Sequence, residues 1–184
     1  MTGLDSRVLL APDDGSLGPL LRLADDRLAP GVGYGRHAHR EVDVVAVVLA
    51  GSLAHRWGDG ARIGAGDVGV LRAGTGLEHD EVAGPDGAHV LQCYLRTTRP
   101  DAGPAHEVRA AVSGWVELGR PDARLWTRRT APGEPVEVPP GLLILADGDE
   151  VRAEPQPGGA VRTAGAGTAL VWQLDTSRPA WASD

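Results

Sequence analysis

The sequence predicts an all-β protein built from two β units in tandem. Glycine (26 residues) and proline (14 residues) recur between short apolar runs along the 184-residue chain. Helical periodicity is almost absent from these runs, and glycine provides the positive φ that tight turns between strands need. The chain is long enough to bury a core, and a pair of packed barrels or sandwiches would leave few free sheet edges.

The first unit is expected to span residues 1–97 and to contain the more regular strands. Apolar, β-branched runs predict strands over 42–49, 61–63, 67–72 and 88–95. The segments between them, such as "WGDG" and "GAGD", carry the glycines that turns require.

A Pro-rich stretch then predicts a linker over residues 98–118, in which a helix over 106–113 is weakly indicated. The second unit is expected to span residues 119–184. Its strands are predicted over 123–130, 142–145, 150–153 and 168–174, again separated by glycine and proline.

Charge and composition exclude several classes of function. The formal net charge is −7, and the 18 cations, all of them arginine, form no basic stripe, so neither nucleic acid nor an anionic membrane is an expected partner. No apolar run approaches the roughly 20 residues of a membrane span. The single cysteine, Cys93, gives no sign of an oxidising compartment. We therefore expect a cytoplasmic protein that acts on a small molecule. Because its two units would bury each other's faces, we also expect a monomer.

Two histidines stand one residue apart in the segment "GRHAHREVD". On a strand, residues two apart point to the same face, so the imidazoles of His37 and His39 would project together. That arrangement supplies half of a metal site. The alternative is a pair of exposed polar residues on a strand edge.

A second pair of the same spacing follows in "GTGLEHDEV", where His79 and Glu81 would also share a face. If the two pairs converge, three imidazoles and one carboxylate surround one divalent ion and leave coordination positions open. Donors of this kind, without thiolate, suit Fe(II), Ni, Co, Mn or Zn.

The order of these segments, "HAHREVD", "LAGSLAHRWGDG", "IGAGDVGVLRAGTGLEHDE" and "AHVLQCYL", resembles the cupin superfamily. Within it, the sequence resembles the pirin and pirin-like quercetinase family over residues 26–95. The second half is similar only in outline, through "ARLWTRRTAPGE" and "ALVWQLD". Three features depart from the family pattern: Ala38 replaces a usual proline, Asp43 stands where Glu is common, and the chain is short.

The resemblance implies a bicupin, two double-stranded β-helix barrels, of which the second is compact and metal-free. It also implies that the metal ligands are His37, His39, His79 and Glu81, and that the ion is most often iron. Some members of the family oxygenate flavonols such as quercetin, whereas others are regulatory.

The expected function is therefore that of a metal-dependent dioxygenase acting on a flavonol-like or other enolisable or phenolic molecule. Glu81, as a ligand that can loosen, is the candidate catalytic residue for accepting a substrate proton. Two alternatives remain open, since the same ligands serve all three. One is a non-enzymatic, redox-sensing regulatory cupin; the other is an O2-independent isomerase, cyclase or lyase.

Further polar residues are given secondary roles. Asp43 and Gln92 are candidates for the pocket or for orienting a ligand, and Gln92 and His89 must lie on opposite strand faces. His55 is expected to hydrogen-bond a turn, and His106 to be solvated.

The remaining candidates receive structural interpretations. Asp25 and Asp26 are interpreted as solvated loop acids whose side chains point apart, and Cys93 as a small core residue. The tryptophans of the second half are expected to fill its core: Trp115, Trp126 and Trp172.

Overall fold

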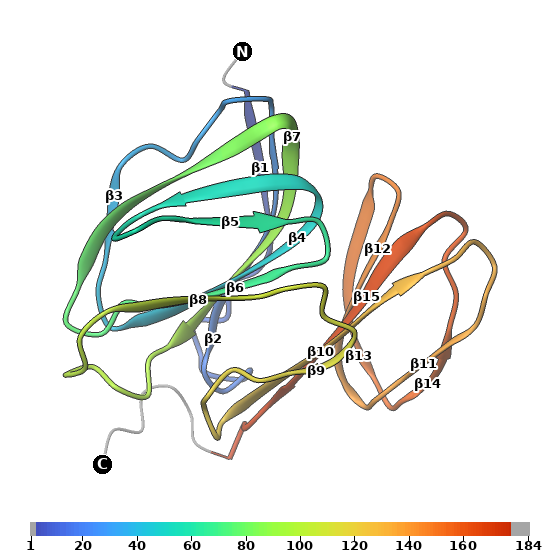
Figure 1. The fold of residues 1–184 in the computed structure, drawn as a ribbon. Coiled ribbons are helices and arrows are strands. Elements are labelled where there is room, and N and C mark those ends of the chain that lie inside the picture. Colours follow the sequence, from blue (N-terminus) through green and yellow to red (C-terminus); the bar gives the residue numbers. More distant parts are fainter. Residues whose placement is uncertain (1–2, 178–184) are drawn as a thin grey trace. The chain divides into compact units, whose positions relative to one another are not determined.

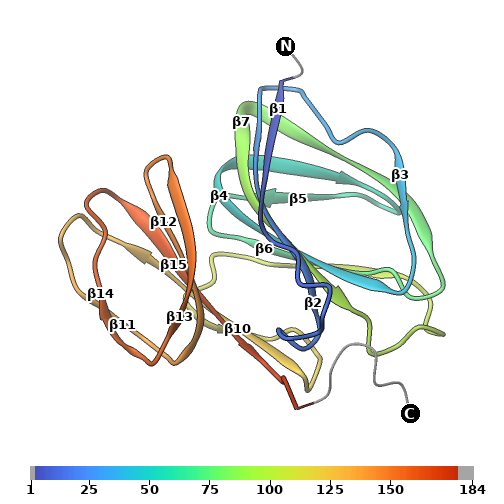
Figure 2. The same ribbon diagram turned by 180° about the vertical axis from the view of Figure 1, so that it is seen from behind.

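The computed structural model describes residues 3–177, and all regular secondary structure in this range is β-strand. The described chain forms two compact units (Figures 1 and 2), residues 3–13 with 20–111 and residues 14–19 with 112–177. None of it forms a helix that could cross a membrane. The strands of the first unit are β1 (Leu4–Leu10), β2 (Leu20–Leu28), β3 (His37–His39), β4 (Val42–Arg56), β5 (Ala61–Gly64), β6 (Val68–Arg72), β7 (Leu77–Arg96) and β8 (Ala105–Arg109).

The two longest strands, β4 and β7, organise the first unit. They pair with each other along most of their length, within a sheet ordered β1-β2-β7-β4-β6-β8. The early part of β7 also pairs with β3, whereas its later part pairs with β2. The sheet is open, with β1 and β8 as its edges, so the described strands do not close into a barrel by hydrogen bonding.

A bend divides β4 into two parts, of which the first pairs with β6 and the second with β5. The β4–β7 register shifts between Val48 and Ala50 and again between Gly51 and Leu53. Gly51 has a φ of +68°, and a Cβ there would lie 2.1 Å from the carbonyl oxygen of Gly87. Bulges of this kind bend and twist a strand. Glycine is therefore required at position 51, where the backbone of β4 comes this close to that of β7.

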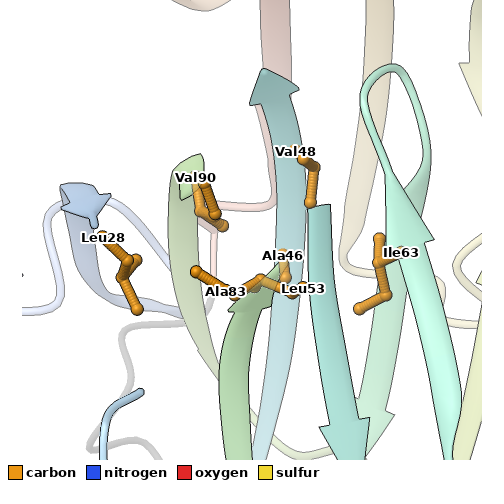
Figure 3. Packing of buried hydrophobic residues seen from close by; sticks show 8 residues of the cluster. Leu28, Ala46, Val48, Leu53, Ile63, Ala83 and Val90 are labelled. Carbon is orange, nitrogen blue, oxygen red and sulfur yellow. The ribbon is translucent and has the colours of Figure 1, made fainter. Parts of the chain in front are cut away.

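Aliphatic side chains fill the end of the first unit that lies around this bend (Figure 3). β4 contributes Ala46, Val48 and Leu53, and the other strands contribute Leu28, Ile63, Ala83, Ala88 and Val90. All of these side chains are buried, and each fully buried branched aliphatic side chain contributes about 1.5–3 kcal/mol through removal from water. This packing fixes the positions of β4 and β7, on which the polar residues described below stand.

The second unit is a smaller antiparallel structure. Its strands are β9 (Gly114–Val116), β10 (Ala123–Thr130), β11 (Val136–Val138), β12 (Gly141–Asp147), β13 (Glu150–Gln156), β14 (Gly159–Val161) and β15 (Gly167–Leu174). Five of them form a sheet ordered β13-β12-β15-β10-β9, and β11 pairs with β14. Trp172 is buried and Trp126 packs against the core, as predicted. Trp115 is 43% exposed on the edge strand β9, with the Arg124 guanidinium 4.0 Å from its ring centroid, so its core assignment is wrong.

The all-β prediction is confirmed. Seven of the eight predicted strands coincide with or lie within observed ones, and the eighth, over 67–72, begins one residue before β6. The stretch over 98–118, expected to be a linker, contains β8, which pairs with β6, and β9, which pairs with β10. The helix predicted within it is wrong, because residues 105–109 are extended. The main change from the first unit to the second falls between Ala111 and Val112, and residues 14–19 also belong to the second unit.

The close approach of the β4 and β7 backbones at Gly51 can be tested with two glycines of similar φ. Gly31 has a φ of +71°, and a Cβ there would have no neighbouring atom within 4 Å. Gly31→Ala should therefore lower the free energy of unfolding by only about 1 kcal/mol, the cost of placing alanine in the left-handed conformation. Gly51→Ala should cost about 1–3 kcal/mol more, because its methyl group meets the Gly87 carbonyl. The free energy of unfolding in urea measures both. Equal losses of unfolding free energy in the two variants would contradict this close approach of the two backbones.

Candidate metal centre

The pairing of β3 with β7 brings the two sequence motifs together. His37 lies directly opposite His79, Ala38 opposite Glu78, and His39 opposite Leu77. Because side chains alternate along a strand, His37 and His39 share one face, and His79 stands beside them on the neighbouring strand. The expected convergence of these three imidazoles is what the strand register produces.

The ring nitrogens of these histidines face one another. The Nε2 atom of His37 lies 3.0 Å from Nε2 of His39 and 3.1 Å from Nε2 of His79. The Nδ1 atom of His37 lies 2.7 Å from the carbonyl oxygen of Gly35, and since a carbonyl only accepts, Nδ1 must carry the proton. The neutral His37 ring therefore presents the lone pair of Nε2 to the cluster.

This spacing suits a metal ion. Imidazole nitrogens bind divalent metals at about 2.0–2.1 Å, so two ligands on one ion are separated by about 2.8–3.4 Å for angles between a right angle and a tetrahedral one. Both separations from His37 Nε2 fall within that range. The separations of His37 Nε2 from the other two ring nitrogens are thus those expected of ligands on one ion.

Glu81 is buried next to this cluster. One oxygen or nitrogen from each of His55, His79 and Glu81 lies within 4.8 Å of the others, in a second group that shares His79 with the first. The Gln92 amide donates a hydrogen bond of 3.0 Å to Glu81 Oε2. Burial raises the pKa of Glu81 to about 7, despite this hydrogen bond and with a contribution from the nearby Asp26. Glu81 can therefore release and take up a proton near neutral pH.

The pKa values of the imidazoles are shifted in the opposite direction, which favours the neutral form that binds metals. Burial, together with neighbouring histidines, lowers the pKa of His79 to about 3 and those of His39 and His55 to about 4. A cationic ring is disfavoured here both by lost hydration and by the positive charge of a second protonated ring.

His55 and His106 do not occupy the positions expected from the sequence. The turn-bonding role of His55 is wrong, because His55 is buried and its Nε2 lies 2.7 Å from Nδ1 of His79. His106 is half-buried on β8 rather than solvated in a linker, and its ring stacks on that of His55 at 3.9 Å and 19°. The sequence does not predict these contacts, because His55, His79 and His106 lie far apart in the chain.

The two tyrosines of the chain flank the cluster, although sequence reasoning singled out neither. The Tyr34 ring lies 6.4 Å from that of His37, and its hydroxyl donates to Asp26 Oδ2 at 2.9 Å. The Tyr94 ring lies 5.7 Å from that of His39. The available signal was position in the sequence, since Tyr34 comes just before the His37 segment and Tyr94 lies two residues after Gln92.

The remaining candidate residues lie either on the strand face that carries the histidine cluster or on the opposite face. Gln92 and His89 lie on opposite faces, as predicted, because Gln92 bonds Glu81 whereas His89 Nε2 lies 2.6 Å from Asp25 Oδ1. Asp43 is buried on β4 and belongs to neither histidine group.

The interpretation of the two adjacent acids as solvated loop residues is wrong, because both are buried in β2. Their side chains do point apart, as expected. Asp25 faces His89 and Arg7, while Asp26 accepts hydrogen bonds from Ser6 and Tyr34.

Among the described residues, both groups of clustered histidines and carboxylates lie in the first unit. Two tandem β units, with a histidine-rich centre on the strands of the first, are the arrangement expected of a bicupin fold. Comparisons with known proteins show what the chain is similar to.

Part of the first unit is similar to the pirin family. The family model described as Pirin matches residues 12–95. The chain is 30% identical over 106 residues to a quercetin 2,3-dioxygenase of Escherichia coli K12, in a match that covers 54% of the chain and 46% of that protein. It is 31% identical over 87 residues to a pirin-like protein of Caulobacter vibrioides, with 46% and 38% covered. The matched segments thus span less than half of these curated relatives.

Solved structures show the same fold over nearly the whole chain. A bacterial pirin from Escherichia coli in complex with nickel(II) superposes with a TM-score of 0.70, at 17% identity, over 95% of this chain and 93% of that one. A quercetin 2,3-dioxygenase from Acinetobacter baumannii superposes with a TM-score of 0.67, at 18% identity, over 97% and 83%. The bicupin fold predicted from the sequence is confirmed.

The shifted histidines predict how the stability of metal-free protein depends on pH. The folded-state pKa values of His39, His55 and His79 lie below the usual 6.5, so the unfolded state binds more protons between about pH 6.5 and 4. Glu81 opposes this trend, because its pKa is raised from the usual 4.5 to about 7. It is a single group, however, whereas three histidines act in the other direction. Stability should therefore fall as the pH is lowered from 6.5 to 4.5.

Urea unfolding of chelator-treated protein at several pH values measures this dependence. The variant His79→Gln should show a shallower fall, because one of the three shifted groups is gone. A free energy of unfolding that is constant or rises toward pH 4.5 would contradict the burial of neutral imidazoles.

Proposed function

We propose that this protein is a metal-dependent dioxygenase that acts on a flavonol of the quercetin type. The observation that carries the proposal is the convergence of the Nε2 atoms of His37, His39 and His79. Relatives named quercetin 2,3-dioxygenase and structural neighbours of the same name support the reaction class.

The proposed ligands are the three histidines and Glu81, and the proposed ion is Fe(II). A donor set of imidazole and carboxylate without thiolate suits Fe(II), Ni, Co, Mn and Zn. Iron is preferred for a reaction with O2, because it exchanges electrons readily. When bound, the ion would act as a Lewis acid toward the enolate oxygen of the substrate and assist the reaction with O2.

Glu81 is proposed as the residue that takes the enol proton of the substrate. Its pKa of about 7 is close to the pH at which a general base works most efficiently. Gln92 holds one carboxylate oxygen through its amide, which leaves the other oxygen to bind the ion or the proton. Burial of the carboxyl keeps bulk water from competing for it.

The tyrosines have a proposed role in binding. Tyr34 lies near His37 and Tyr94 lies near His39, where aromatic side chains can contact a planar polyphenol. The hydrogen bond from Tyr34 to Asp26 fixes the position of that ring. Both residues would orient substrate rather than take part in the chemistry.

Metal binding itself is the first test. Purified protein should hold about one divalent ion per chain, and His79→Ala should weaken its affinity at least about 100-fold, because one of few ligands is lost. The matched control is His89→Ala, since His89 faces Asp25 on the opposite face and should leave the affinity unchanged. Elemental analysis after dialysis and competition with a chelator measure both. Full metal content in His79→Ala would overturn the ligand assignment.

Oxygen uptake tests the reaction. Fe(II)-reconstituted protein should consume one O2 per quercetin, followed with an oxygen electrode and by loss of flavonol absorbance. Glu81→Gln should lower kcat by about 100-fold or more, the range for loss of a general base. Glu78→Gln is the matched control, because Glu78 is 58% exposed on the same strand and pairs with Arg36.

The reconstitution should be repeated with Ni, Co and Mn. Metal binding without O2 uptake on any flavonol or enediol would overturn the oxygenase proposal and leave a regulatory or O2-independent cupin. Equal loss of kcat in both glutamate variants would contradict the role of Glu81.

A further inference from the structure

The hydrogen bond between His55 and His79 connects the proposed ligands to a residue outside the ligand set. We propose that His55 is a positioning residue, backed by His106, that fixes the tautomer and ring plane of His79. The inference rests on the proposed binding of metal by His79. It assigns a role to two histidines that lie outside the proposed ligand set.

The direction of this hydrogen bond follows from the chemistry of the ring. If Nε2 of His79 offers its lone pair to an ion, the proton of the neutral ring must be on Nδ1. Nδ1 then donates to His55 Nε2, 2.7 Å away, and the proton of His55 must be on its own Nδ1. A partner that accepts on one ring nitrogen of a ligand is the usual device for orienting histidine at a metal.

A direct ligand role for His55 is less compatible with the same distance. Two nitrogens bound to one ion at about 2.0–2.1 Å are separated by about 2.8 Å or more. The separation of His55 Nε2 from His79 Nδ1 is 2.7 Å, which suits a short hydrogen bond between the two rings. The grouping of His55 with His79 and Glu81 therefore reflects an orienting contact.

The surroundings of His55 hold its ring in place. On β4, His55 lies opposite Glu81 of β7 on one side and Ala61 of β5 on the other. Its ring is stacked on that of His106 with centroids 3.9 Å apart. Space for His106 depends on Gly69, where a Cβ would lie 3.4 Å from His106 Nε2 and 2.6 Å from a methyl group of Ile63.

Two substitutions of His55 separate a hydrogen-bond role from simple packing. His55→Phe keeps a ring against His106 but removes the acceptor, and it should weaken metal affinity by about 10–100-fold. His55→Gln restores an acceptor oxygen near the position of Nε2, so its affinity should lie within about threefold of the parent protein. Chelator competition with Co(II) and Zn(II) gives the affinities, and the Co(II) absorption spectrum reports ligand geometry without any turnover.

The tautomers give an independent measurement on metal-free protein. Long-range 1H–15N correlation spectra should show the Nδ1–H tautomer for both His79 and His55. Protonation of His79 at Nε2 instead would overturn the inference, whether or not His55→Phe folds.

Failure of this inference and failure of the proposed function can be told apart. Unchanged affinity in His55→Phe, or an equal loss in both variants, would overturn the positioning role while leaving the metal site of the parent protein intact. A parent protein that binds no metal would overturn the proposed function.

Discussion

The antiparallel pairing of β3 with β7 is the constraint on which the candidate centre depends. That ladder places His37 opposite His79, and strand alternation then brings His39 to the same face. A slip of one residue would turn these side chains to the other face, because the side-chain period of a strand is two. The register is held in turn by the long pairing of β7 with β4 and by the aliphatic packing around their bend.

Burial of the centre has opposite consequences for its two kinds of group. It keeps His39 and His79 neutral far below their usual pKa, and it raises the pKa of Glu81 to about 7. Neutral imidazoles are ready to bind a cation, whereas a buried carboxyl with such a pKa is costly as an isolated anion. A divalent ion at this position would satisfy both, which is a physical reason for the residues to be assembled as they are.

The polar residues of the candidate centre stand on long strands whose other ends are packed in an apolar core. One strand, β7, contributes His79, Glu81, Gln92 and Tyr94, while β4 contributes His55. The second unit repeats the antiparallel architecture with an apolar core. The likeness of the chain to solved pirin structures is one of fold.

The sequence by itself determined the all-β class, most of the central strands and the spacing that puts His37 with His39 and His79 with Glu81, because these follow from local alternation and turn chemistry. It did not show β2 or β8. β2 is covered on both faces and buries adjacent acids, and β8 follows a Pro-rich stretch. Only the tertiary structure decided that His55 bonds His79 and stacks on His106. Those contacts join side chains on three strands far apart in the chain, and register and packing, which no local pattern encodes, bring them together.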